Sequence, residues 1–225
     1  MLFFTKMRLE YKNMRFVFWL PLLLAWIVVP VVGWFNYMSR WIGHDALYYT
    51  IDTIEQLVPL FSCGWTLVML DKYLIGNIKY LILVYQKGKS CIFEILFNCI
   101  LLISSMLPTY ILLYQLFPSY EIMLGEFLKC ASQIVFLNGL VYMVSFFLRD
   151  NVYGFIAAVL YYSLFRILRL DMPQYCIFAF SVLYFNNPAV IITVRNTCLA
   201  ALVFFLLGYL AEKIYRQKRC FVLKA

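Results

Sequence analysis

Six apolar segments set the limits on how this chain can fold. They are separated by charged or proline-containing breaks and cover about 16–37, 54–70, 92–117, 127–148, 152–168 and 189–211. A helix needs about 20 apolar residues to cross a bilayer, and a helix satisfies its own backbone hydrogen bonds where no water is available. We therefore predict an all-α membrane protein with six transmembrane helices.

The composition agrees with lipid as the surrounding solvent. Of the 225 residues, 65% are hydrophobic and 13% are charged, whereas about a quarter of a soluble domain is charged. The formal net charge of +8 lies mostly at the ends of apolar segments, where it favours a fixed topology and contact with anionic headgroups. This pattern argues against a nucleic-acid partner and for membrane lipid.

The distribution of basic residues predicts the topology. With the N-terminus inside, only five of the 19 Lys and Arg residues face outside, and the other 14 face inside. The five are Arg40, Lys129, Arg166, Arg169 and Arg195. The positive-inside rule thus favours both termini in the cytoplasm, and we expect the chain in the plasma membrane.

Two further elements are predicted outside the six spans. Residues 1–15 carry Phe4, Met7, Tyr11 and Met14 at helical spacing, which is typical of an amphipathic helix in the membrane interface. Residues 174–187 are apolar but too short to cross, and a seventh span there would move the basic tail at 218–225 outside. We interpret them as a re-entrant outer element. Residues 16–217 form the membrane domain.

The longest basic break between spans runs from Asp71 to Glu94. Its apolar run at 80–85 is too short to span, and lysines flank it on both sides. A short helix over about 77–87, held at the cytoplasmic surface, is predicted to dock a soluble partner.

Catalytic and metal-binding signatures are absent from the sequence. It contains no GxxxxGK[ST], GxSxG or HExxH motif, and its seven cysteines form no CxxC pair. His44 has no neighbouring ligand residue, and the spans read as apolar at their centres. These features predict no enzyme activity, no metal and no cofactor on this chain, so energy for any active process must come from another protein.

The order of these features resembles a type-2 ABC transporter permease, the membrane half of many bacterial exporters. The local match is the run from Met69 to Gly76, MLDKYLIG, followed by Leu81, Leu83 and Lys89, together with the Asn187-Pro188 step before the last span. Tyr73 stands where the family often has an acidic residue, and Gln86-Lys87-Gly88-Lys89 replaces a Pro-Ser or Ser-Arg pair.

The resemblance implies a cytoplasmic coupling helix, a separate ATP-binding subunit that carries ATP and Mg²⁺, and a second permease chain in a homodimer or heterodimer. Tyr80 and Tyr85 would anchor the coupling helix in the partner, and its lysines would meet either acidic residues or headgroups. The expected contact residues are Ile78, Lys79, Tyr80, Leu83, Tyr85 and Lys87.

The resemblance also places a substrate path between two permease chains, lined by the second and fifth spans. Its apolar, aromatic character suggests an amphipathic peptide, a lipid or a hydrophobic drug, although each residue could instead pack helices or face lipid. The candidates for the path are Phe61, Trp65, Tyr161, Tyr162 and Phe165. Arg166, Arg169 and Asp171 would form an outer gate or extend to the outer interface.

Two other classes of function remain open from the sequence. One is an ATP-independent channel or secondary carrier, which would show gradient-driven flux without a partner. The other is a non-transporting assembly or sensor subunit.

Overall fold

A computed structural model describes residues 16–39, 45–74, 90–117, 120–167 and 188–222. Within these ranges the chain is helical, with no strand. The first rod comprises α2 (Phe16–Leu23), a π-helical turn (Leu24–Val28) and α3 (Val29–Met38). Five further helices follow: α4 (Asp45–Leu74), α6 (Ile92–Leu116), α7 (Tyr120–Leu148), α8 (Asn151–Ile167) and α9 (Pro188–Val222).

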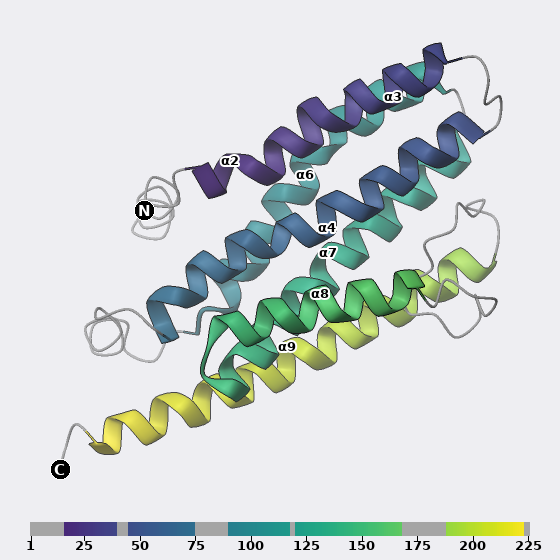
Figure 1. The fold of residues 1–225 in the computed structure, drawn as a ribbon. Coiled ribbons are helices and arrows are strands. Elements are labelled where there is room, and N and C mark those ends of the chain that lie inside the picture. The colour runs from purple at the N-terminus through teal and green to yellow at the C-terminus, as the bar shows by residue number, and fades with distance from the viewer. Residues whose placement is uncertain (1–15, 40–44, 75–89, 118–119, 168–187, 223–225) are drawn as a thin grey trace.

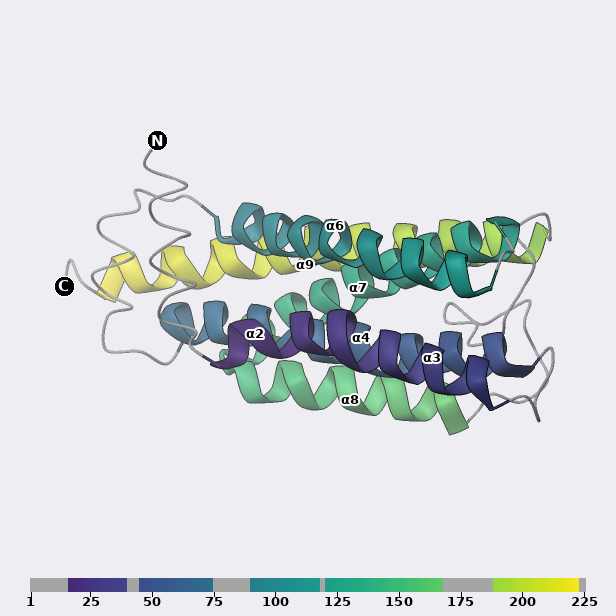
Figure 2. The same cartoon turned by 90° about the horizontal axis from the view of Figure 1, so that it is seen from above.

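The helices lie roughly side by side and alternate in direction along the chain (Figures 1 and 2). The start of the first rod and the end of α9 lie at one end of the bundle, here called the terminal end. The end of α4, the start of α6, the end of α7 and the start of α8 also lie there, whereas the facing ends of α3 and α4, of α6 and α7, and of α8 and α9 lie at the opposite end, here called the far end.

Each predicted span has a helix at its place. Five helical segments are long and apolar enough to cross a membrane: Phe16–Met38, Tyr49–Leu74, Ile92–Leu116, Met123–Leu148 and Val190–Gln217. The 17 residues of α8 fall short of the usual length. The chain is therefore a multi-pass, all-helical membrane protein with five candidate spans in its described part.

The boundaries differ from the prediction in three helices. α4 begins at Asp45 and α7 at Tyr120, each several residues before the predicted span, and α9 continues to Val222 beyond the predicted end at residue 211. Charged and polar residues near these ends were counted as loop, but they lie inside helices. The predicted elements at 1–15, 77–87 and 174–187, and the last three residues of the tail, lie outside the described residues.

Pro30 explains the π-helical turn in the first rod. In that turn the N–H of Val29 donates to the carbonyl of Leu24, five residues back. In the same pattern, the carbonyl of Ala25 would accept a hydrogen bond from the N–H of residue 30. Residue 30 is a proline and has no N–H. The hydroxyl of Thr109 on α6 donates to the Ala25 carbonyl instead at 2.7 Å. The carbonyl freed by Pro30 thus makes a contact between the first rod and α6.

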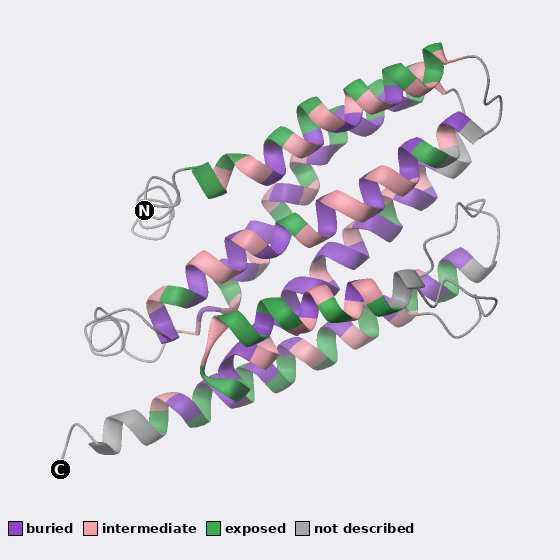
Figure 3. Ribbon diagram, viewed as in Figure 1, coloured by how far each residue is buried: buried purple, intermediate pink, exposed green. Residues whose placement is uncertain are grey.

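α7 lies at the centre of the bundle, and it contacts α4, α6, α8 and α9. Large apolar side chains, such as Leu202, Leu206 and Leu210 of α9, are exposed on the outer faces (Figure 3). Buried positions face inward and include polar groups such as Asn98, Asn138 and Glu212. A membrane accommodates this arrangement because lipid covers the apolar exterior.

Candidate functional site

The predicted coupling residues, from Ile78 to Lys87, lie outside the described residues. The structure instead describes the two flanks of this segment. α4 ends at Leu74, and the chain resumes at Ser90 and Cys91 before α6. Both flanks lie at the terminal end (Figure 1), where a buried polar network joins them to the rest of the bundle.

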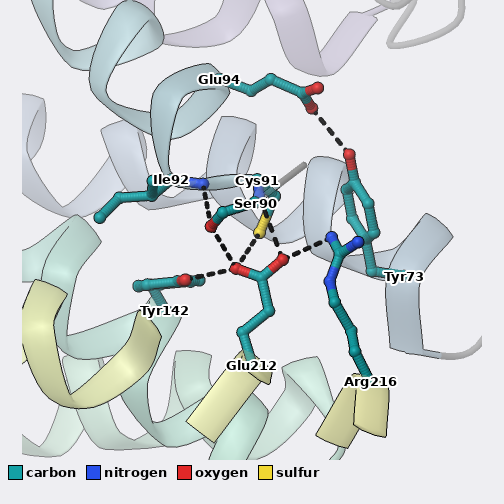
Figure 4. A network of polar contacts seen from close by, with 8 residues as sticks. All are labelled: Tyr73, Ser90, Cys91, Ile92, Glu94, Tyr142, Glu212 and Arg216. Carbon is teal, nitrogen blue, oxygen red and sulfur yellow. Dashed lines mark hydrogen bonds and ion pairs between the residues drawn. The ribbon is translucent and has the colours of Figure 1, made fainter. Parts of the chain in front are cut away.

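The centre of this network is the carboxylate of Glu212 on α9 (Figure 4). The Ser90 hydroxyl donates to Oε2 at 2.6 Å, and the Cys91 backbone N–H donates to Oε1 at 3.2 Å. The first N–H groups of a helix have no partner within it and carry partial positive charge. Glu212 therefore holds the start of α6 against α9.

Two more groups complete the carboxylate's surroundings. The Tyr142 hydroxyl of α7 donates to Oε2 of Glu212 at 2.5 Å. Arg216, one turn further along α9, places a guanidinium nitrogen 2.5 Å from Oε1. Since Glu212 is 1% exposed, this pairing and these donors compensate the loss of water around its charge.

The other flank, the end of α4, joins this network through Tyr73 in its last turn. Its hydroxyl donates to Oε2 of Glu94 on α6 at 3.0 Å, and the Arg216 guanidinium lies over its ring, 5.7 Å from the centroid. A cation above an aromatic face is attracted by the electron-rich ring. The network thus links the ends of α4 and α6 with α7 and α9, and we call it the Glu212 network.

The Cys91 thiol of this network is structural in character. It donates to Oε2 of Glu212 at 3.5 Å. Burial, and then the negative charge of Glu212, raise the pKa of the Cys91 thiol well above its ordinary value. A thiol that stays protonated is a poor nucleophile, so this cysteine contributes a weak donor and packing.

A second polar cluster lies midway along α4 and α7. Asn138 donates to the Ser62 hydroxyl at 2.8 Å and accepts from the Thr66 hydroxyl at 2.5 Å. All three side chains are buried, and the space beside them is too small for a water molecule. Their hydrogen bonds therefore join α4 to α7 directly in a region where unpaired polar groups are costly.

A third cluster lies nearer the far end and carries charge. Nζ of Lys129 on α7 is 2.7 Å from Oε1 of Glu55 on α4 and 2.7 Å from Oε2 of Glu126 on α7. Each of the three residues is at most 1% exposed. Ionisable groups at such depth are costly and are therefore candidates for a functional role. We call them the Glu55–Glu126–Lys129 cluster.

This cluster corrects the interpretation of the sequence. Lys129 was counted among the charges that face outside, and Glu126 lies just before the predicted span at 127–148. All three are buried inside helices, and α7 includes Glu126 because it begins at Tyr120, before the apolar run does. The spans consequently hold charged and polar groups at depth. The available signal was the spacing of Glu126 and Lys129, which places an acid and a base one turn apart.

The predicted path residues do not gather on one described surface. Trp65 is buried, stacks on Phe18 at 5.2 Å between ring centroids and donates to two carbonyls of α2. Tyr161 packs on Phe136 of α7 at 4.9 Å between centroids. Phe61 is partly exposed and Tyr162 is buried. A path between two chains stays a prediction.

The remaining predicted residues fall where the structure describes little. Phe165 and Arg166 belong to α8 by backbone, without a described side chain, while Arg169 and Asp171 lie outside the described residues. The outer gate stays a prediction. Among the residues that the structure describes, no three His, Cys, Asp or Glu side chains group in a way that could hold a metal ion.

Comparison with known proteins gave no matching family model, no matching curated protein and no matching solved structure.

Proposed function

We propose that this chain is the transmembrane permease subunit of an ATP-driven exporter. With a second permease chain it forms the path for an amphipathic or hydrophobic substrate, and a separate ATP-binding subunit supplies the energy. The helix order and the alternating directions support this proposal. So does the position of the end of α4 and the start of α6, which lie at the same end of the bundle as the end of α9.

The single observation that carries the proposal is the Glu212 network. It ties Tyr73, just before the break at 75–89, and Cys91, just after it, to α7 and α9. A partner pushing on the segment between them would displace both flanks, and the network would pass that displacement to α7 and α9. A segment without such connections would move alone and leave the bundle unchanged.

The partner would bind the segment from Ile78 to Tyr85. Aromatic side chains provide large contact area at low entropic cost, so Tyr80 and Tyr85 would be the anchors. ATP binding, with Mg²⁺, would bring two partner subunits together and shift the bundle between two states of access. The terminal end would face the cytoplasm in the plasma membrane.

The test is purification of the tagged chain from its native host, followed by an ATPase assay on the complex. We expect an ATP-binding subunit to be retained, and Tyr80→Ala with Tyr85→Ala to reduce its recovery at least about tenfold, the effect of losing one or two buried aromatic anchors. Tyr153→Ala with Tyr209→Ala is the matched control, because both tyrosines are exposed on outer faces of α8 and α9.

Two results would contradict the exporter proposal. One is purified chain that never retains an ATP-binding subunit. The other is a retained subunit whose recovery and ATPase activity are the same in both double variants. Retention lost equally in both would indicate general misfolding, which thermal unfolding of the purified variants would reveal.

A second candidate function is an ATP-independent secondary carrier, and the Glu55–Glu126–Lys129 cluster favours it. Carriers commonly hold ionisable residues within the membrane. Flux into liposomes that contain only this chain, driven by an imposed gradient without ATP, would support the carrier. The exporter predicts no such flux.

A further inference from the structure

The first rod and α6 form a groove near the far end of the bundle. Both belong to candidate membrane spans, and the groove has a volume of about 400 Å³, which is within the range of ligand pockets. Val31, Trp34 and Leu112 on its walls are exposed, so the groove opens outward, where a membrane presents hydrocarbon and no water. The six lining residues, five of them apolar, are Pro30, Val31, Trp34, Leu112, Gln115 and Leu116.

Side-chain contacts hold the two walls of the groove together at both of its ends. Towards the middle of the bundle, the Trp26 indole donates to the Ser105 carbonyl at 2.7 Å. The hydrogen bond from Thr109 lies one turn further along α6. At the other end, the rings of Tyr37 and Phe117 meet edge to face, 5.8 Å between centroids. The groove is therefore formed in advance, which lowers the cost of ordering an occupant.

The groove differs in chemistry between its two ends. Pro30, Val31 and Leu112 line the part that is closer to the middle of the membrane. Gln115 lies at the other end, as the next-to-last residue of α6. Its amide can both donate and accept hydrogen bonds. An occupant that fits this arrangement is apolar along most of its length and polar at one end.

Aromatic rings mark the level of the membrane interface at the polar end of the groove. The ring of Trp34 lies 6.3 Å from that of Tyr37, which contacts Phe117, and Trp and Tyr gather at the level of lipid head groups. Residues 30 to 37 cover about 10 Å along the helix axis, whereas one leaflet contributes about 15 Å of hydrocarbon. The groove thus covers the upper part of one leaflet.

We propose that this groove binds a phospholipid of the leaflet at the far end. One acyl chain lies between the first rod and α6, and the Gln115 amide donates a hydrogen bond to an ester or phosphate oxygen. Free lipid is as apolar as the groove walls, so the preference for a bound lipid comes from the preformed shape and from this hydrogen bond. The groove lies at the end opposite the Glu212 network, so its occupancy does not depend on an ATP-binding subunit.

The test is photo-crosslinking of the full chain in nanodiscs of palmitoyl-oleoyl phosphatidylglycerol. A trace of the same lipid carries a diazirine in one acyl chain, and mass spectrometry of peptides locates the label. We expect residues 30–34 and 112–116 to carry at least about fivefold more label than the exposed face of α9, the ratio that a preference of about 1 kcal/mol gives.

Two substitutions locate the lipid within the groove. Val31→Phe places a ring in the groove and should remove the excess label. Val203→Phe is the matched control, because Val203 is exposed on α9, and it should leave the excess label unchanged. Gln115→Leu should lower the excess label about two- to fivefold through the lost hydrogen bond. All three positions are exposed, so each variant should keep its Tm within about 4 °C of the unsubstituted protein.

Three results would overturn the proposal. The first is equal label on the groove and on α9, which would indicate ordinary surrounding lipid only. The second is excess label that persists in Val31→Phe protein of unchanged Tm. The third is excess label that Gln115→Leu leaves unchanged, and this variant decides the outcome if Val31→Phe fails to fold.

Discussion

At the scale of single residues, a few buried carboxylates organise contacts that apolar packing alone would not specify. Glu212 accepts hydrogen bonds from α6 and α7 and pairs with Arg216 on its own helix. An apolar side chain at this position could fill the same volume, but it would not select these partners. Removing the carboxylate would leave two hydroxyls, a backbone N–H and a guanidinium without their acceptor.

Glu212→Ala should therefore lower the free energy of unfolding by about 3 kcal/mol, the usual cost of breaking a buried ion pair. Glu212→Gln, which keeps an acceptor oxygen, should cost less. Thermal unfolding of purified protein, followed by tryptophan fluorescence, measures both. Lys213→Ala is the control because Lys213 is exposed on the next position of α9. Equal Tm values for Glu212→Ala and the control would refute a stabilising network.

At the scale of helices, α7 and α9 approach each other closely at Gly208. A Cβ on Gly208 would lie 2.5 Å from Cδ1 of Tyr142 and 3.2 Å from the backbone Cα of Met143. The neighbouring backbone cannot yield as a flexible side chain could. Tyr142 also binds Glu212, so any shift of its ring disturbs the terminal end of the bundle.

We expect Gly208→Ala to destabilise the protein by about 1–3 kcal/mol through overpacking. The matched control is Gly64→Ala in α4, where the nearest atom to an added Cβ is a Val17 methyl at 3.6 Å. There alanine should be neutral or stabilising by up to about 1 kcal/mol, because it favours the helix. Denaturation midpoints of the two variants compare them directly, and a Gly208 variant as stable as the Gly64 variant would contradict this packing.

The helices themselves were largely predictable, whereas their polar contacts were not. Long apolar runs between charged breaks located all six helices, since the cost of burying backbone groups leaves few alternatives in lipid. The pairing of Glu55 with Lys129 depends on which faces of α4 and α7 meet. No periodicity in either helix specifies that pairing, because neither partner lies near the other in sequence. The same reason explains why the contacts of Glu212 with Ser90 and Tyr142 were not predicted.

At the scale of the whole molecule, the alternating helix directions place the start of the first rod and the end of α9 together. Six crossings would leave both termini on one side of the membrane. Five crossings, with α8 failing to span, would separate them. The 17 residues of α8 cover about 25 Å at the usual helical rise, a little less than the hydrocarbon core of about 30 Å.

We expect reporters fused at Met1 and at Ala225 to be cytoplasmic, as both the six-span arrangement and the basic end of the chain favour. Fluorescent-protein and alkaline-phosphatase fusions at each end measure this, because the first reporter is active inside and the second outside. Opposite locations for the two termini would disprove six crossings and indicate that α8 stays on one side.

The position of Glu55 also has a consequence for how the chain enters the membrane. Synthesis proceeds from the N-terminus, so α4 reaches the insertion machinery before Lys129 has been made. α4 contains the least apolar of the five candidate spans, and a charged residue well inside a membrane helix costs about 3 kcal/mol. α4 must therefore enter the bilayer with its carboxyl group neutral or remain loosely inserted until α7 follows. The assembly of this bundle is completed out of chain order, when a later helix secures an earlier one.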